Sequence, residues 1–198
     1  MNPYVKLDIS DKIGTIEFYH PQSNSLPSII LKKLADMIYS AGQKEEISVI
    51  VLKSGGDRTF CAGASFDELM KIENASQGKD FFSGFAHVIN ASRKCPKLII
   101  GRVQGKAVGG GVGMASATDY CFATKFASIK LSELAVGIGP FVVGPAVDGC
   151  RFRPTGCTGG DAGKWRFGSA AGRCSADAHD ASRGDECGVC EKGPVRTG

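Results

Sequence analysis

The sequence has no long apolar run, no signal-like start and no cluster of charge of one sign. No stretch approaches the ~18 consecutive apolar residues that indicate a membrane helix, and residues 1–6 lack the basic start and apolar core of a secretory signal. Lysine and arginine total 24 against 20 acidic residues, and the lysines are scattered rather than interleaved with aromatics. We therefore expect no membrane and no nucleic-acid partner, and a cytoplasmic location.

Leucine and isoleucine are missing from the end of the chain. Residues 1–148 hold 23 of them, whereas residues 149–198 hold none. A stretch without these side chains cannot extend the preceding core, and its Gly, Arg and Cys content, with six of the nine arginines, is typical of a GC-rich coding region translated out of frame. We predict one domain over residues 1–147 and an irregular tail over residues 148–198, either out of frame or natively disordered.

The eight cysteines are unevenly distributed. Cys61, Cys95 and Cys121 lie far apart in apolar or small-residue segments, which favours small buried thiols over a disulfide scaffold. The other five follow residue 149, and among them Cys187 and Cys190 have the spacing of half a zinc site. No second pair with matching spacing accompanies them. We predict no metal, and a zinc-binding module in the tail is an alternative.

Hydrophobic periodicity predicts that strands and helices alternate along the body of the chain. Apolar residues at every second position indicate strands, those at helical spacing indicate amphipathic helices, and β-branched runs indicate strands covered on both faces. The predicted elements are a hairpin at 5–18, helices at 29–41 and 77–93, buried strands at 47–52 and 98–103, a short helix at 112–117 and a strand at 120–123. This alternation favours an α/β fold.

Three segments contain residue types suited to ligand binding and proton transfer. Residues 59–66 are mostly small, so their backbone amides can approach a ligand closely. Gly109, Gly110 and Gly111 lead into a helix N-terminus, where free amides favour negative charge. Glu133 is a single carboxylate in an apolar neighbourhood, where it can act as a proton shuttle. Taken singly, a glycine triplet is more often a tight turn or close helix packing, and a lone glutamate is more often a helix-start or surface residue.

These glycines do not form a dinucleotide-binding fingerprint, because no spacing from Gly109 to Gly113 gives the complete Gly-x-Gly-x-x-Gly pattern. The motifs that stand in order along the chain are His20-Pro21, Asn24-Ser25-Leu26, Phe60-Cys61-Ala62-Gly63-Ala64, Gln104-Gly105, Gly109-Gly110-Gly111, Ala117-Thr118-Asp119, and Ser132-Glu133 with Gly137-Ile138-Gly139-Pro140. Together they resemble the crotonase superfamily of enoyl-CoA hydratases and isomerases. The resemblance covers residues 1 to about 147 and implies a ββα spiral core, with the C-terminal helical region missing or replaced here.

The resemblance also implies the site. By motif position, the backbone amides of Ala64 and Gly110 would hold the thioester oxygen of an acyl-CoA, and Glu133 would be the acid and base for an enolate intermediate. The residues that would contact coenzyme A are Phe60, Ala62, Ala64, Phe66, Gly109 and Gly110. No cofactor is implied beyond the coenzyme A moiety of the substrate. The family also implies a homotrimer or a dimer of trimers.

Gly113 is the main departure from the family pattern. Hydratases of the family have the first of two glutamates at this position, so its absence favours one-base, isomerase-like chemistry by Glu133. Asp67 and Glu68 are alternative sources of a second carboxylate, and the position that supplies an acid in dienoyl-CoA isomerases falls near Phe141. A catalytically impaired protein that binds CoA thioesters or assists assembly is the alternative function.

Overall fold

The chain begins with an antiparallel β-hairpin. A computed structural model describes residues 2–133 and 137–148, and the predicted irregular tail lies outside this part except for Asp148. Strands β1 (Tyr4–Ser10) and β2 (Ile13–Tyr19) pair in full register and are joined by Asp11 and Lys12, with φ angles of 51° and 64°. Two left-handed residues give the tight turn whose twist matches paired strands. The predicted hairpin is confirmed.

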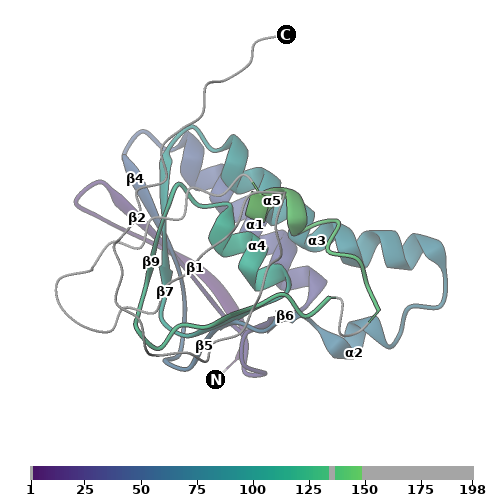
Figure 1. The fold of residues 1–198 in the computed structure, drawn as a ribbon. Coiled ribbons are helices and arrows are strands. Elements are labelled where there is room, and N and C mark those ends of the chain that lie inside the picture. The colour runs from purple at the N-terminus through teal and green to yellow at the C-terminus, as the bar shows by residue number, and fades with distance from the viewer. Residues whose placement is uncertain (1, 134–136, 149–198) are drawn as a thin grey trace, which may run out of the picture.

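The hairpin is one edge of a five-stranded sheet. Its remaining strands are β4 (Val49–Ser54), β7 (Leu98–Val103) and β9 (Tyr120–Ala123), in the order β1-β2-β4-β7-β9. All pairs beyond the hairpin are parallel. Parallel neighbours require crossover connections, which helices usually provide. The predicted α/β alternation is therefore confirmed, and Figure 1 shows the helices packed together on one side of this sheet.

Two long helices make most of that layer. Helix α1 (Ser28–Gln43) and helix α3 (Ala75–Lys94) confirm the two predicted amphipathic helices. The side chain of Asn74 caps α3 by accepting a hydrogen bond from the Gln77 N–H at 3.0 Å, and Arg93 and Lys94 suit the negative end of the helix dipole. Within the residues described above, no helix is both long enough and apolar enough to cross a membrane.

Short elements surround the glycine-rich part of the chain. Strands β10 (Ile129–Lys130), β8 (Lys106–Val108) and β5 (Thr59–Cys61) form a parallel three-stranded sheet, and β3 (Ser25–Leu26) pairs with β6 (Gly63–Ala64). Helices α2 (Phe66–Leu69), α4 (Gly110–Ser116) and α5 (Gly144–Asp148) complete the described elements. The short strands were not predicted, because two or three residues show no periodicity.

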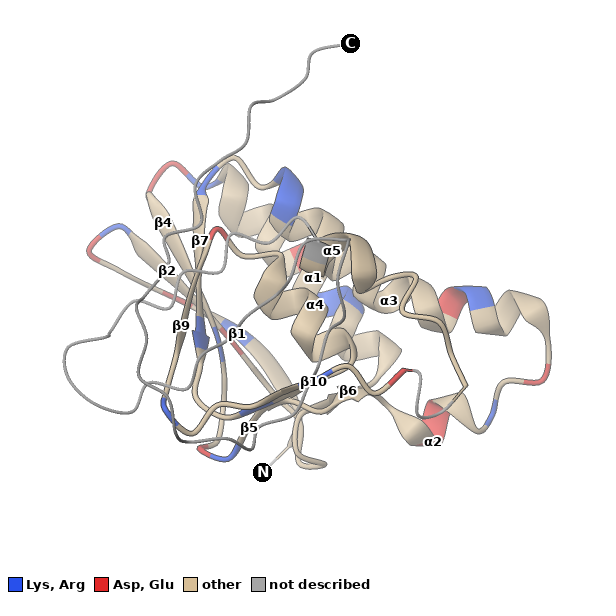
Figure 2. Ribbon diagram, in the orientation of Figure 1, with Lys and Arg blue, Asp and Glu red and all other residues tan. Residues whose placement is uncertain are grey.

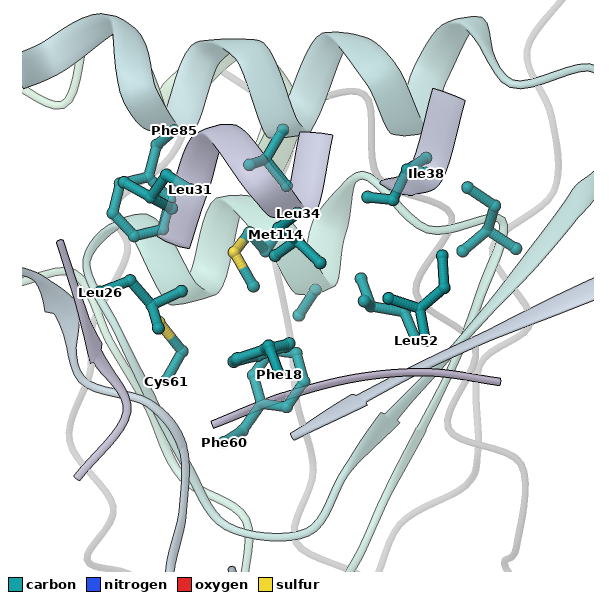
Figure 3. Packing of buried hydrophobic residues seen from close by; sticks show 14 of the residues in the cluster. Phe18, Leu26, Leu31, Leu34, Ile38, Leu52, Phe60, Cys61, Phe85 and Met114 are labelled. Atoms are coloured by element: carbon teal, nitrogen blue, oxygen red, sulfur yellow. The ribbon is translucent and has the colours of Figure 1, made fainter. Parts of the chain in front are cut away.

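The hydrophobic core lies between the large sheet and the helices. Figure 3 shows Leu31 and Leu34 of α1 close to Phe85 of α3 and Met114 of α4, above the aromatic pair of Phe18 and Phe60. The rings of Phe18 and Phe60 are 5.4 Å apart, edge to face. The core thus joins α4 and the β5 segment to the sheet.

The opposite face of the sheet carries an ion-pair cluster around the buried side chain of Glu17. Glu17 alternates with core residues on β2, so its carboxylate points away from the helices. It accepts hydrogen bonds from Tyr4 and forms ion pairs with Lys6 at 3.2 Å and Lys53 at 2.6 Å. Burial would raise the pKa of Glu17, but these partners outweigh it and lower the pKa to about 2. In Figure 2 charges of both signs recur on strands, helices and loops, and neither sign gathers on one element.

Candidate active site

Buried amide side chains fix the loop that leads into β5. Asn24 is only 3% exposed, and its Nδ2 donates to the carbonyl oxygens of Gly55 at 3.0 Å and Thr59 at 2.8 Å. Directly after β7, Gln104 Nε2 donates to Ser54 Oγ at 2.8 Å and to the Thr59 carbonyl at 3.3 Å. Asn24 has a φ of 56°, a left-handed conformation that asparagine tolerates better than most residues. The loop is therefore held to the large sheet before it reaches the candidate site.

The segment that follows β5, residues 62–64, is called the arm below, and it brings Ala64 next to the glycine triplet. Gly63 has a φ of 96°, and a Cβ placed on it would lie 3.3 Å from the Val108 carbonyl and 4.0 Å from the Gly110 nitrogen. Ala64 follows directly, and its carbonyl accepts a hydrogen bond from Ser25 Oγ at 2.9 Å. No group in the described part of the chain accepts from the Gly110 N–H. The two predicted donors thus belong to adjoining backbone segments.

Each glycine of the triplet faces a different neighbour, which explains why three glycines stand together. A Cβ on Gly110 would lie 2.6 Å from atoms of the Phe85 ring, and a Cβ on Gly111 would lie 2.6 Å from the Cys61 carbonyl oxygen. Real Cβ atoms do not approach other atoms so closely, because packed interiors leave no such overlap. The glycines therefore let α4 pack directly against α3 and β5, in addition to any approach of a ligand.

Gly109, the remaining glycine of the triplet, faces the carboxylate of Glu133. A Cβ on Gly109, whose φ is 52°, would lie 3.3 Å from Glu133 Oε1. The other carboxylate oxygen, Oε2, is buried and has no hydrogen-bond partner in the described structure. The backbone there is held by a hydrogen bond of 2.9 Å from the Ile138 N–H to the Glu133 carbonyl. Since buried polar atoms are nearly always hydrogen-bonded, an unpartnered oxygen of the carboxylate that faces Gly109 marks a position for an external group.

The neighbourhood of Gly113 is filled and apolar. A Cβ on Gly113 would lie 2.9 Å from Ile89 Cδ1 and 3.4 Å from both methyl groups of Val143. Both side chains are buried, with 6% and 3% exposed. The segment with Val143 is tied to α3 by a hydrogen bond of 3.2 Å from Arg93 Nη1 to the Pro145 carbonyl. A glutamate at this position would have to displace the wall formed by the side chains of Ile89 and Val143.

The alternative carboxylates are engaged elsewhere. Glu68 Oε2 accepts hydrogen bonds from the Ser28 N–H at 2.9 Å and the Ser28 hydroxyl at 2.7 Å, which ties α2 to the start of α1. Asp67 Oδ2 accepts from Gln22 Nε2 at 3.1 Å. Neither carboxylate is paired with Glu133, so the site has a single acidic side chain among these candidates.

The residues predicted to contact coenzyme A differ in exposure: Phe60 is buried, whereas Phe66 is exposed. Phe60 is fully buried and packs against Phe18, so its side chain belongs to the core and only its backbone borders the loop. Ala62 is half-buried, and Phe66 is 60% exposed at the start of α2, which leaves its ring accessible. Phe141, discussed as an acid position, is 86% exposed. The structure therefore leaves Phe66 as the aromatic side chain of this loop that a ligand can reach.

Some functional features were missed by sequence reasoning. Ser25 was read only as part of a motif, and its hydroxyl proves to bind the Ala64 carbonyl. Phe85 lies within the helix predicted at 77–93, and periodicity gives no signal of its contact with Gly110. No group of three or more metal-ligating side chains occurs in residues 2–133 and 137–148. The Cys187 and Cys190 pair lies outside them.

Comparison with known proteins identifies the family of the chain. The family model for enoyl-CoA hydratase/isomerase matches residues 8–147. An enoyl-CoA hydratase structure from Mycobacterium smegmatis aligns with a TM-score of 0.69 and 25% identity, covering 74% of this chain and 57% of that one. The short-chain-enoyl-CoA hydratase of Clostridium acetobutylicum is 29% identical over 137 residues, covering 69% of this chain and 52% of that protein.

The fold is thus a mixed α/β crotonase fold, as predicted. The chain belongs to the enoyl-CoA hydratase/isomerase family. It spans about half the length of the curated relatives it matches. Those relatives differ in reaction. One of them, from Mycobacterium tuberculosis, is named a hexahydro-indene-carboxyl-CoA hydrolase. It is 30% identical over 118 residues, and the alignment covers 60% of this chain and 47% of that protein. Membership of the family therefore leaves the reaction open.

Proposed function

We propose that this chain binds an acyl-CoA thioester and moves a proton on its acyl group with Glu133 alone. The thioester oxygen would lie between the N–H groups of Ala64 and Gly110. The observation that carries the proposal is the buried, unpartnered Oε2 of Glu133 beside Gly109. A carboxylate oxygen that accepts no hydrogen bond from the described residues is available to a C–H proton of the substrate.

In the proposed reaction, the carbon–carbon double bond of the acyl chain moves from the 3-position to the 2-position. The Glu133 carboxylate removes a proton from the α-carbon of a 3-enoyl thioester, and the electron pair moves onto the thioester oxygen as an enolate. Two backbone donors aimed at that oxygen contribute about 3 kcal/mol each to its stabilisation. The protonated Glu133 then returns the proton to the γ-carbon, which gives the 2-enoyl thioester.

Two features favour this reaction over hydration. Addition of water needs a second group to orient and deprotonate the water, and the wall of Ile89 and Val143 fills the space beside Gly113. Asp67 and Glu68 are bonded to other residues. Glu133 therefore both removes the proton and returns it.

The test is proton exchange at the α-carbon of a saturated acyl-CoA in D2O, followed by mass spectrometry. We expect exchange with the 198-residue chain, and loss of exchange in Glu133→Gln with binding retained. Glu73→Gln is the matched control, because Glu73 is an exposed carboxylate outside the site. Binding without exchange in the unaltered chain would instead support the function of a non-catalytic CoA-thioester binder, and exchange that survives Glu133→Gln would reject the proposed base.

A further inference from the structure

Phe85 lies directly against the backbone of Gly110. A Cβ on Gly110 would lie 2.6 Å from Cγ, Cδ1 and Cδ2 of the Phe85 ring. Equal distances to three neighbouring ring atoms mean that the α-carbon of Gly110 faces the flat side of the ring. The ring is only 6% exposed. This contact is between a side chain of α3 and the residue whose N–H is a proposed donor.

The ring cannot easily retreat from Gly110. Helix α3 approaches α1 closely at the preceding residue, because a Cβ on Gly84 would lie 2.8 Å from Leu31 Cδ1. Figure 3 shows the Phe85 ring beside Leu31, with Met114 of α4 further along the same layer. Close-packed side chains transmit displacement rather than absorb it. The position of the ring is therefore set by two helices.

The start of α4 has few other restraints. Its N-cap is Gly109, which has no side chain to form a capping hydrogen bond. The Gly109 N–H is bonded to the Lys130 carbonyl at 2.9 Å, which restrains the residue before Gly110. Opposite, the Gly63 arm approaches the Gly110 nitrogen. The three atoms nearest to a Cβ on Gly110 all belong to the Phe85 ring, so this ring is the side chain that packs on the residue itself.

We propose that Phe85 is a positioning residue for the Gly110 N–H, and that the ring sets where this donor meets the thioester oxygen. This inference rests on the proposed function, because it assumes that Gly110 is a donor. Donors must be held within about 0.5 Å of the productive geometry to be effective. A smaller side chain at position 85 would let the first turn of α4 move toward α3 and away from the oxygen.

The direct test uses the infrared carbonyl stretch of a bound, 13C-labelled acyl-CoA in the full chain. Hydrogen bonds from the donors lower this frequency, so Phe85→Leu should lose part of the shift and slow α-proton exchange about tenfold or more. Affinity for free coenzyme A, which has no thioester carbonyl, should change less than about twofold, since the contact that Phe85→Leu alters is absent from this ligand. Phe82→Leu on the same helix is the control, because Phe82 is 40% exposed.

A double-mutant cycle gives a second readout that depends on the ring itself. Gly110→Ala places a methyl group into the ring and should lower exchange strongly in the unaltered chain. In the Phe85→Leu background the same change should cost less, since the space has been opened. If Phe85→Leu does not fold, Phe85→Met keeps most of the volume and replaces it in the cycle.

The outcomes separate the two proposals. A carbonyl shift that survives Phe85→Leu unchanged, or a Gly110→Ala effect that is equal in both backgrounds, would overturn the positioning role while leaving the proposed function intact. The absence of any carbonyl shift and any exchange in the unaltered chain would overturn the proposed function and this inference with it. A reduced shift in Phe85→Leu with a normal shift in Phe82→Leu is the expected result.

Discussion

The glycines of α4 provide a matched pair of substitutions whose stability effects should differ in size. Gly111 and Gly113 are both buried and stand two positions apart in the same short helix. Alanine in a helix interior is favoured over glycine by about 1 kcal/mol. Without tertiary contacts, both replacements by alanine would therefore stabilise the protein. What differs is the group that the new methyl meets.

The Gly111→Ala methyl would meet backbone. It would lie 2.6 Å from the Cys61 carbonyl oxygen and 2.7 Å from Cys61 Cβ, and Cys61 is fixed by the pairing of β5 with β8. Overpacking of this kind costs up to about 3 kcal/mol. After the gain in helix propensity, we expect a net loss of about 2 kcal/mol in the free energy of unfolding.

The Gly113→Ala methyl would meet only the ends of side chains. The nearest atom is Ile89 Cδ1 at 2.9 Å, a terminal methyl group that can turn away. Shifting one rotamer costs about 1 kcal/mol, which offsets the gain in helix propensity. We expect a net change close to zero.

Urea denaturation followed by circular dichroism measures both free energies of unfolding. The m-value should stay constant, because neither methyl changes the surface exposed on unfolding. The expected gap between the two variants is about 2 kcal/mol, with Gly111→Ala the less stable. Equal stability of the variants, or greater loss in Gly113→Ala, would refute the reasoning from neighbouring atoms.

Two further predictions concern buried polar groups. The lowered pKa of Glu17 stabilises the protein above the ordinary carboxyl pKa of 4.5, and that stabilisation is lost as the pH falls toward about 2. We expect a loss of up to about 3 kcal/mol over this range, and a flatter acid profile for Glu17→Gln in urea titrations at several pH values; identical profiles would contradict it. Asn24→Ala removes the hydrogen bonds to Gly55 and Thr59 and puts alanine at a φ of 56°. It should cost about 3 kcal/mol in denaturant unfolding, and a loss below ~0.5 kcal/mol, typical of surface sites, would show that the loop does not depend on it.

Sequence periodicity predicted the elements that are long enough to have a period. The hairpin, α1, α3, β4 and β7 follow the expected ranges to within two residues at every boundary. The two-residue difference at the start of β4 has a local cause, because the Ser48 N–H bonds to the Lys12 carbonyl at 2.7 Å before the regular ladder begins. The two- and three-residue strands escaped prediction because they are defined by partners far away in the sequence, which a local pattern does not contain.

Motif order located the candidate site, whereas the contacts around its residues can be seen only in the structure. Motif order pointed to Ala64, Gly110 and Glu133, and the structure gathers these positions around Gly109. The assignment of roles to them stays a prediction. Sequence could not reveal that the space beside Gly113 is filled, since that depends on side chains from two other elements.

The hydrogen bonds at the Thr59 carbonyl also bear on the order of folding. This oxygen is bound by side chains that lie 35 and 45 residues away along the chain, in Asn24 and Gln104. Long loops must close before such contacts form, and their closure entropy delays them. We therefore expect the arm that carries Ala64 to become ordered late, after the local hairpin and helices have formed. Retention on an immobilised acyl-CoA analogue would thus separate fully folded chains from intermediates that already contain native secondary structure.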